Sequence, residues 1–153
     1  SVIEPYEQQS RIANIRRLEL TDEKGAGLPE PCVAVEIRLA DGHKDLVVTA
    51  DREIFLGHRV ETSEPPQSVQ ADWRARFEAN LAFVRLDSAG KVERIAMCRA
   101  RSARIGDVEV KLRKFTDFIE IAFEGAKARV VGGDKDAVQD VTIGGKSAVE
   151  KAD

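Results

Sequence analysis

The sequence predicts an all-β protein, an antiparallel β-sandwich built from a meander and hairpins with little helix. Three observations predict it. Between residues 81 and 131, short alternating apolar runs are separated by small polar or glycine-bearing turns. Between residues 32 and 50, two further alternating runs flank Asp41-Gly42. The alternation has a period of two, which places successive side chains on opposite faces of a strand, and regular turns between such runs are typical of a sandwich or open barrel.

The chain up to residue 31 gives weaker signals. A short apolar start ends at Pro5 and Tyr6. Residues 11–20 carry four apolar side chains at mixed spacing, so strand and helix both stay open there. Two glycines and two prolines between residues 21 and 31 predict a loop.

Residues 32–50 form the clearest predicted hairpin. Val33, Val35, Ile37 and Leu39 alternate with smaller or charged residues, and residues 46–49 form the return strand. Asp41-Gly42 lies between them, and a glycine after aspartate is a strong hairpin signal because it accepts positive φ. Further on, the prolines at 65 and 66 predict a loop, because proline cannot donate to a strand ladder.

Residues 69–87 satisfy two patterns. Trp73, Phe77 and Leu81 have helical spacing, but a strict alternation runs from Val69 to Phe83. Because the alternation is longer, we expect one continuous strand, with Trp73 in the core. The alternative is an exposed indole that stacks on a sugar ring, which makes Trp73 a glycan-binding candidate.

The meander continues to residue 131. Val108, Val110 and Leu112 alternate with charged residues, and residues 92–98 are expected to be partly buried on both sides. Glycines at 90, 106, 125, 132 and 133 mark the turns. One last short strand is expected between residues 138 and 143, and residues 146–153 are expected to fray.

Length and composition bound the function classes. The 153 residues are 42% apolar and 33% charged, with a net charge of −3, which predicts one soluble globular domain over residues 1–153. The mixed charge gives no electrostatic footprint for nucleic acid, and no apolar run approaches the roughly 20 residues that span a bilayer. Because the chain starts at Ser1 and its only methionine is Met97, we expect a fragment of a longer protein or a processed form.

No residue pattern specifies catalysis, a metal or a cofactor. Asp41, His43 and Asp45 share one hairpin turn and His58 lies downstream, but the same run is also an ordinary solvated turn, which we favour. There is no nucleophile elbow and no phosphate-binding glycine loop. The two cysteines, Cys32 and Cys98, are expected to be free thiols, with a disulfide as the alternative.

A basic cluster lies between residues 94 and 114, where seven lysines and arginines occur. Arg99 and Arg101 are expected to share one face of an extended segment, where guanidinium groups can bind the carboxylates or sulfates of an anionic polymer. They are therefore glycan-binding candidates. The alternative, which we favour, is a solvated face whose charges pair with Glu93, Asp107 and Glu109.

The opening residues Val2-Ile3-Glu4-Pro5-Tyr6, followed by Ile12, Ile15, Arg17 and Leu18, resemble the segment that enters the last β domain of heparinase II/III-like polysaccharide lyases. Residues 33–50 and 81–98 are also similar to that region. The resemblance implies a parent protein with an α/α toroid and large antiparallel sheets. Such lyases cleave uronic-acid polysaccharides by β-elimination, with tyrosine and histidine as acid and base. No position here matches those catalytic residues, so none is assigned.

The resulting hypothesis is an accessory β-sandwich, catalytically silent alone. It would support the catalytic domain of the same parent chain or contact an acidic polysaccharide, in the periplasm or outside the cell if the resemblance holds. One alternative is an autonomous carbohydrate-binding module that uses Trp73, Arg99 or Arg101. The other is a small β enzyme with a pocket that holds His43 or His58 beside a carboxylate.

Overall fold

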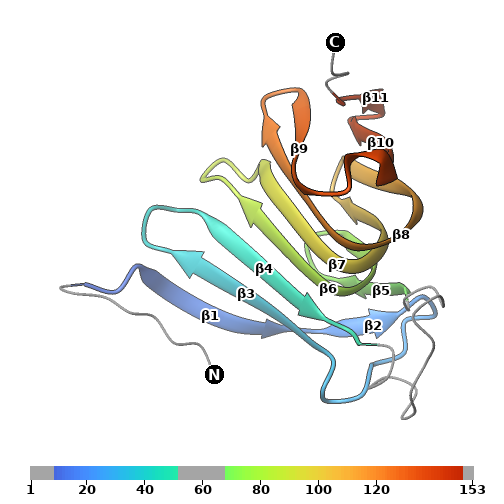
Figure 1. The fold of residues 1–153 in the computed structure, drawn as a ribbon. Helices are drawn as coiled ribbons and strands as arrows, with labels where there is room; N and C mark the ends of the chain where they lie inside the picture. Colours follow the sequence, from blue (N-terminus) through green and yellow to red (C-terminus); the bar gives the residue numbers. More distant parts are fainter. Residues whose placement is uncertain (1–8, 52–67, 150–153) are drawn as a thin grey trace.

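A computed structural model describes residues 9–51 and 68–149, and within them eleven strands form one antiparallel sheet (Figure 1). The predicted all-β antiparallel class is confirmed, and a single 3₁₀ turn, Lys135–Ala137, is the helical part of the described residues. Figure 1 shows the strands β1 (Ile12–Leu18), β2 (Leu20–Asp22), β3 (Val33–Leu39), β4 (Lys44–Thr49), β5 (Ser68–Ala71), β6 (Ala75–Leu86), β7 (Val92–Ile105), β8 (Val108–Glu124), β9 (Lys127–Gly133), β10 (Val138–Ile143) and β11 (Lys146–Ser147).

The sheet curls over itself into a sandwich-like arrangement of two layers. Strands β6, β7 and β8 are long enough to contribute one half to each layer, as their curvature in Figure 1 shows. The first layer joins β1, β3 and β4 to the later half of β6, then to β7, β8 and β9. The second layer joins β2 and β5 to the early half of β6, then to β7, β8, β10 and β11.

Irregular pairing marks the bend between the layers. The register shifts between Glu78 and Ala79 of β6 and between Ala100 and Ser102 of β7. Arg99 lies at the same bend with a φ of 46°, in the left-handed region that non-glycine residues rarely adopt. Bulges of this kind increase the local twist, which lets one sheet turn back and cover itself.

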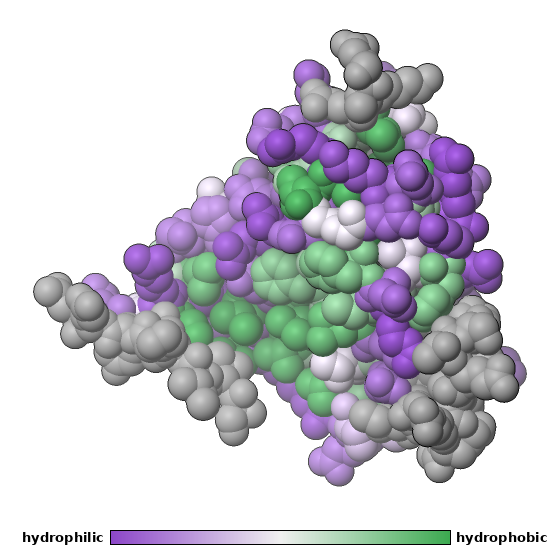
Figure 2. Space-filling model, in the orientation of Figure 1, coloured by the Kyte–Doolittle hydropathy of each residue, from purple (hydrophilic) through white to green (hydrophobic). Residues whose placement is uncertain are grey.

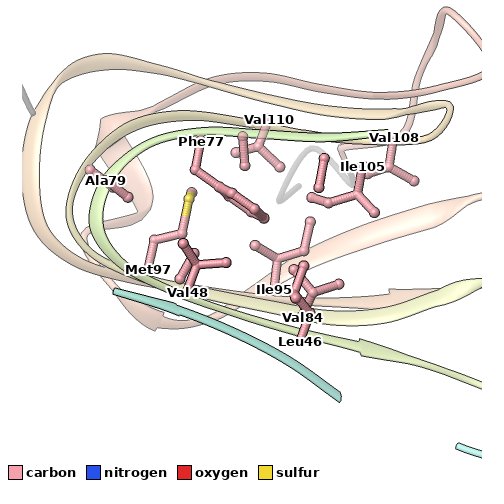
Figure 3. Packing of buried hydrophobic residues seen from close by; sticks show 14 of the residues in the cluster. Leu46, Val48, Phe77, Ala79, Val84, Ile95, Met97, Ile105, Val108 and Val110 are labelled. Atoms are coloured by element: carbon pink, nitrogen blue, oxygen red, sulfur yellow. The ribbon is translucent and has the colours of Figure 1, made fainter. Parts of the chain in front are cut away.

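The core fills the space between the two layers. In Figure 3, Phe77, Ile105 and Val110 of one layer point toward Leu46 and Ile95 of the other. All five side chains are at most 4% exposed. Each buried aliphatic or aromatic side chain of this size contributes about 1.5–3 kcal/mol to the free energy of unfolding through its burial. The alternation of apolar residues in β6, β7 and β8 therefore holds the layers together.

The expectation of one continuous strand from Val69 to Phe83 is wrong. The chain instead turns back at residues 72–74, so that Ala71 pairs with Ala75 and Val69 with Phe77. Trp73 and Arg74 both have positive φ, at 71° and 52°. The loop has three residues, an odd number, so the apolar residues stay on one face across it. The alternation therefore continues through a turn, and the sequence pattern cannot show the reversal.

At the N-terminal end of the described chain, the structure decides between the two alternatives that the sequence left open. At the C-terminal end, it differs from the sequence prediction. Residues 12–18 and 20–22 are strands, which settles the open choice in the N-terminal part. The expected fraying after residue 146 is wrong as far as residue 149. Lys146 and Ser147 pair with β10, and Ala148 is 6% exposed, accepting a hydrogen bond from the N–H of Ala128 and donating to Val141. Pro5, Tyr6, His58, Pro65 and Pro66 lie outside the described residues.

Candidate functional site

The outward side of the first layer, which we call the outer face, is apolar. Its apolar side chains pair directly across neighbouring strands. The pairs are Ile15 with Ile37, Val47 with both Val35 and Phe83, and Cys98 with both Leu81 and Phe118. Paired residues of antiparallel strands lie on the same side of a sheet. Ile15, Leu81 and Phe118 are 46%, 39% and 42% exposed, and the other five apolar members are half-buried. Figure 2 shows this apolar area over β1, β3, β4 and β6.

The outer face arises because β3 turns its small and charged side chains inward. Ala34 and Glu36 are buried, at 0% and 2% exposure, whereas Val33, Val35 and Ile37 are half-buried on the outside. Alternation shows that the two sides of a strand differ, but not which side meets the core. The larger aliphatic side chains of β3 therefore form surface.

Two ion pairs lie within the outer face. Arg85 donates from Nε and a terminal nitrogen to the two carboxylate oxygens of Asp45, at 2.8 and 2.7 Å. Arg94 donates to Glu120 at 2.7 Å. Asp45 is only 7% exposed although it lies on an outward side, because Arg85 and the neighbouring apolar groups cover it. These two pairs are balanced internally, whereas Arg17, which faces Val35 on the same side, donates to the carbonyl oxygen of Glu30.

A second candidate site is an open cleft of about 840 Å³ at one end of the two layers. Turns on both layers border it: residues 72–74, 90–91, 106–107 and 125–126. Aliphatic side chains from the ends of the strands complete the lining, namely Leu86, Val92, Ile105, Val108 and Ile143. The volume lies within the range of about 300–1,000 Å³ usual for small-molecule sites.

Three cations and two carboxylates also line the cleft: Lys44, Arg74 and Lys91 with Asp72 and Asp107. Within residues 9–51 and 68–149, none of the three cationic side chains has an ion-pair partner. The three come from β4 and two different hairpin turns, and the sequence pattern gave no reason to group them. The fold therefore brings together charges that lie far apart in the chain.

Trp73 lies in the turn between β5 and β6, partly buried at the edge of the cleft. Its Nε1 donates a hydrogen bond of 2.7 Å to Glu36, which also accepts from Arg38 at 2.7 Å and from Arg16 at 3.3 Å. Burial raises the pKa of Glu36, but the hydrogen bonds from Arg38 and Trp73 and the charges of Arg16 and Arg38 outweigh it, so the pKa is lower than usual. The indole is thereby held in one orientation against β3.

Arg99 and Arg101 lie away from the cleft, at the bend between the layers. The expected regular extended segment is interrupted, because Arg99 has positive φ. Its guanidinium lies 5.7 Å from the centre of the Phe115 ring, and its Nε is buried with no hydrogen-bond partner among the described residues. Arg101 is exposed. Glycan binding by Trp73, Arg99 or Arg101 stays a prediction.

Several members of the basic cluster between residues 94 and 114 have local partners. Lys111 pairs with Glu109 at 3.4 Å, as expected, and Lys114 pairs with Asp134 at 2.7 Å. Arg113 donates to the carbonyl oxygen of Val138. With Arg94, which pairs with Glu120, three of the seven cations have a carboxylate partner, and Arg113 has a carbonyl partner.

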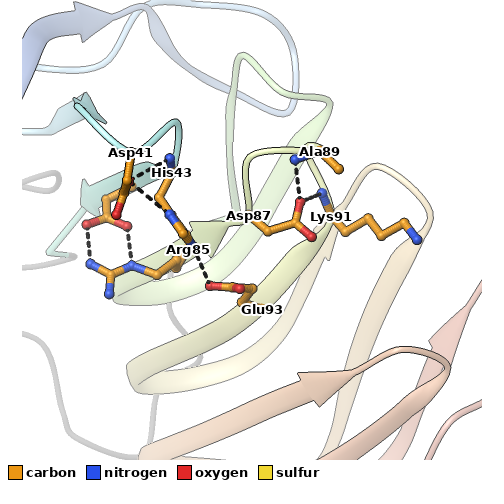
Figure 4. A network of polar contacts seen from close by, with 8 residues as sticks. Asp41, His43, Arg85, Asp87, Ala89, Lys91 and Glu93 are labelled. Atoms are coloured by element: carbon orange, nitrogen blue, oxygen red, sulfur yellow. Dashed lines mark hydrogen bonds and ion pairs between the residues drawn. The ribbon is translucent and has the colours of Figure 1, made fainter.

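His43 lies in the turn between β3 and β4, between two carboxylates (Figure 4). Its Nδ1 is 2.9 Å from Asp41 Oδ1, and its Nε2 is 3.4 Å from Glu93 Oε2. The Asp41 carboxylate, helped by Glu93, raises the pKa of His43 despite some desolvation. Asp45 is held by Arg85 instead, and no group of three or more metal-binding side chains occurs within the described ranges. His43 is not among the residues that line the cleft.

The two cysteines are free, as the sequence analysis favoured. Cys32 is buried, and burial followed by the charge of Asp51 raises the pKa of its thiol. Cys98 is half-buried on the outer face, between Leu81 and Phe118. The chain thus carries one buried and one half-buried thiol.

No family model, curated protein or solved structure matches this chain. Within residues 9–51 and 68–149, no helix is long and apolar enough to cross a membrane.

Proposed function

We propose that this chain is an accessory β domain that packs its outer face against another domain of the same parent protein, a heparinase II/III-like polysaccharide lyase. The observation that supports docking is the outer face itself. The lyase part of the proposal rests on the opening residues 2–6 and the following segment, which resemble the entry to the last β domain of those enzymes.

The composition of the outer face suits burial against a partner. Contiguous exposed apolar surface is characteristic of interaction sites, whereas scattered apolar residues are ordinary. Eight apolar side chains continue across β1, β3, β4, β6, β7 and β8 through direct cross-strand pairs. Sheets commonly pack through such a face, with interdigitating side chains.

The two ion pairs of the outer face do not oppose this docking. Removing one partner of a buried ion pair is strongly unfavourable, because it leaves an uncompensated charge. Asp45 and Arg85 already satisfy each other through two hydrogen bonds, and Arg94 and Glu120 do so through one. A partner can therefore cover them without having to supply a new charge.

In this proposal, the catalytic groups belong to the domain against which the chain packs. The isolated chain then folds but releases no unsaturated uronate product from an acidic polysaccharide. Turnover by the isolated chain, followed by the ultraviolet absorbance of such a product, would contradict the proposal.

The thiol of Cys98 allows a direct test of docking. We would compare the rate of alkylation of Cys98 in the isolated chain and in the full-length parent protein, with buried Cys32 as an internal reference. Docking predicts that Cys98 reacts in the isolated chain and is protected in the parent. Equal rates of Cys98 alkylation in the two proteins would rule out docking through this face.

A pair of charge-adding variants sharpens the test. Leu81→Lys places a charge in the outer face, and Gln139→Lys places the same charge at an exposed position of β10 in the other layer. In the parent protein, Leu81→Lys should restore alkylation of Cys98 and lower the stability of the assembled domains. Gln139→Lys should change neither.

A further inference from the structure

We propose that the cleft at the end of the two layers binds a small molecule with an aliphatic chain and a terminal carboxylate. This proposal is independent of the docking of the outer face, because the two surfaces use different residues. It rests on the shape of the cleft, its aliphatic floor and the three cations at its rim, which have no ion pair with any described residue.

The floor of the cleft continues the core. Leu86, Ile105 and Val108 are 9%, 4% and 4% exposed, and Val92 and Ile143 are half-buried beside them. These five side chains offer no hydrogen-bond donor or acceptor. A sugar bound on them would leave hydroxyl groups without partners, which is unfavourable, whereas an alkyl chain would lose nothing. The floor therefore favours an aliphatic ligand over a saccharide.

The rim supplies the charge that selects an anion. Lys44, Arg74 and Lys91 outnumber Asp72 and Asp107 by three to two. The side chains of the three cations have no ion pairs with described residues, unlike Arg85 and Arg94 on the outer face. A lysine or arginine forms its strongest hydrogen bonds with an ionised acceptor such as a carboxylate. An amphiphile whose carboxylate lies at the rim and whose chain lies on the floor satisfies both parts of the cleft.

The fixed indole of Trp73 forms one wall. Because Glu36 holds its Nε1 at 2.7 Å, the ring keeps its orientation without a ligand, and no rotamer has to be frozen on binding. The N–H of Gly106 donates to the carbonyl oxygen of Arg74 at 3.4 Å, which also links two of the bordering turns. The cleft is thus largely formed before a ligand arrives.

The test uses the single tryptophan of the chain as its reporter. The full chain is titrated with hexanoate, octanoate and decanoate, each below its micellar concentration, while tryptophan fluorescence and heat are recorded. We expect saturable one-to-one binding that tightens about two- to fourfold for each added methylene, the upper value corresponding to complete burial. Decanol and decyltrimethylammonium, with the same chain but no negative charge, should bind at least about fivefold more weakly than decanoate.

A double substitution tests the rim. Lys44→Gln with Lys91→Gln should weaken decanoate binding about tenfold and leave decanol unaffected. The matched control, Lys135→Gln with Lys146→Gln, removes the same charge at exposed positions outside the cleft and should change neither. Circular dichroism of each variant verifies that it is folded.

Three results would overturn the proposal. The first is no saturation with decanoate by either fluorescence or calorimetry. The second is binding of decyltrimethylammonium as tight as that of decanoate. The third is an oligouronate that binds at the same cleft while the affinity for the fatty acids does not change with their chain length. That result would assign the cleft to an acidic saccharide. Docking of the outer face is measured separately by Cys98 alkylation, so failure of one proposal leaves the other standing.

Discussion

The indole N–H of Trp73 donates a hydrogen bond of 2.7 Å to the buried carboxylate of Glu36, thirty-seven positions earlier in the chain. The bond connects the turn after β5, in the second layer, to the inner side of β3, in the first. Glu36 also accepts hydrogen bonds from Arg38 and Arg16, so the carboxylate joins Trp73 to two arginines of the first layer.

We expect Trp73→Phe to lower the free energy of unfolding by about 1–3 kcal/mol, because the substitution removes a donor from a buried, charged acceptor. Chemical denaturation measures this change. A double-mutant cycle with Glu36→Gln separates the hydrogen bond from the loss of ring volume. If the two substitutions prove additive, the bond does not contribute to stability.

The contacts of His43 predict a pH-dependent stability. Its pKa is raised in the folded chain, so its contacts with Asp41 and Glu93 stabilise the fold fully below the ordinary histidine pKa of about 6.5. This stabilisation is lost as the pH rises through the higher pKa of the folded state. Wild type should therefore exceed His43→Gln in stability at about pH 5.5, and the difference should shrink by about pH 8.5, as measured by urea midpoints at each pH. A difference that grows with pH would contradict this assignment.

The two sides of the first layer should respond differently to truncation. Ile95→Ala removes a fully buried side chain and is expected to cost about 2–5 kcal/mol. Leu81→Ala, on the outer face and 39% exposed, should cost about 1 kcal/mol or less. Urea denaturation of both variants measures the contrast. Similar losses of unfolding free energy in the two variants would mean that the outer face is as tightly packed in solution as the core.

Gly133 is predicted to tolerate no side chain. A Cβ there would lie 2.1 Å from the carbonyl oxygen of Phe118, and its φ is +85°. Gly125 also has positive φ, at +62°, but a Cβ there would meet open space. We expect Gly125→Ala to cost about 1–2 kcal/mol, the backbone cost alone, and Gly133→Ala to cost clearly more. Thermal unfolding of the two variants separates the clash from the backbone effect, and equal losses would show that β9 relaxes at no cost.

The strand pattern of the fold could be predicted because alternation depends only on neighbouring residues. It located the hairpin of β3 and β4, the meander and β10. The alternation pattern failed where contacts between distant parts of the chain determine the direction of the backbone or the side of a strand that is buried. The odd-length turn at Trp73 preserved the alternation and concealed a reversal, and β3 gave no sign that Glu36 rather than Val35 faces inward. The cleft could not be predicted either, because Lys44, Arg74 and Lys91 are brought together by the closing of the sheet and share no local motif.

The sharing of β6, β7 and β8 by both layers has a mechanical consequence. In a sandwich of two separate sheets, the layers can slide or separate while each keeps its hydrogen bonds. Here neither can move without bending or breaking strands that belong to the other, so both should unfold in a single cooperative step. The bend near Arg99 joins the two layers covalently at one end, while the side chains packed between them set their separation.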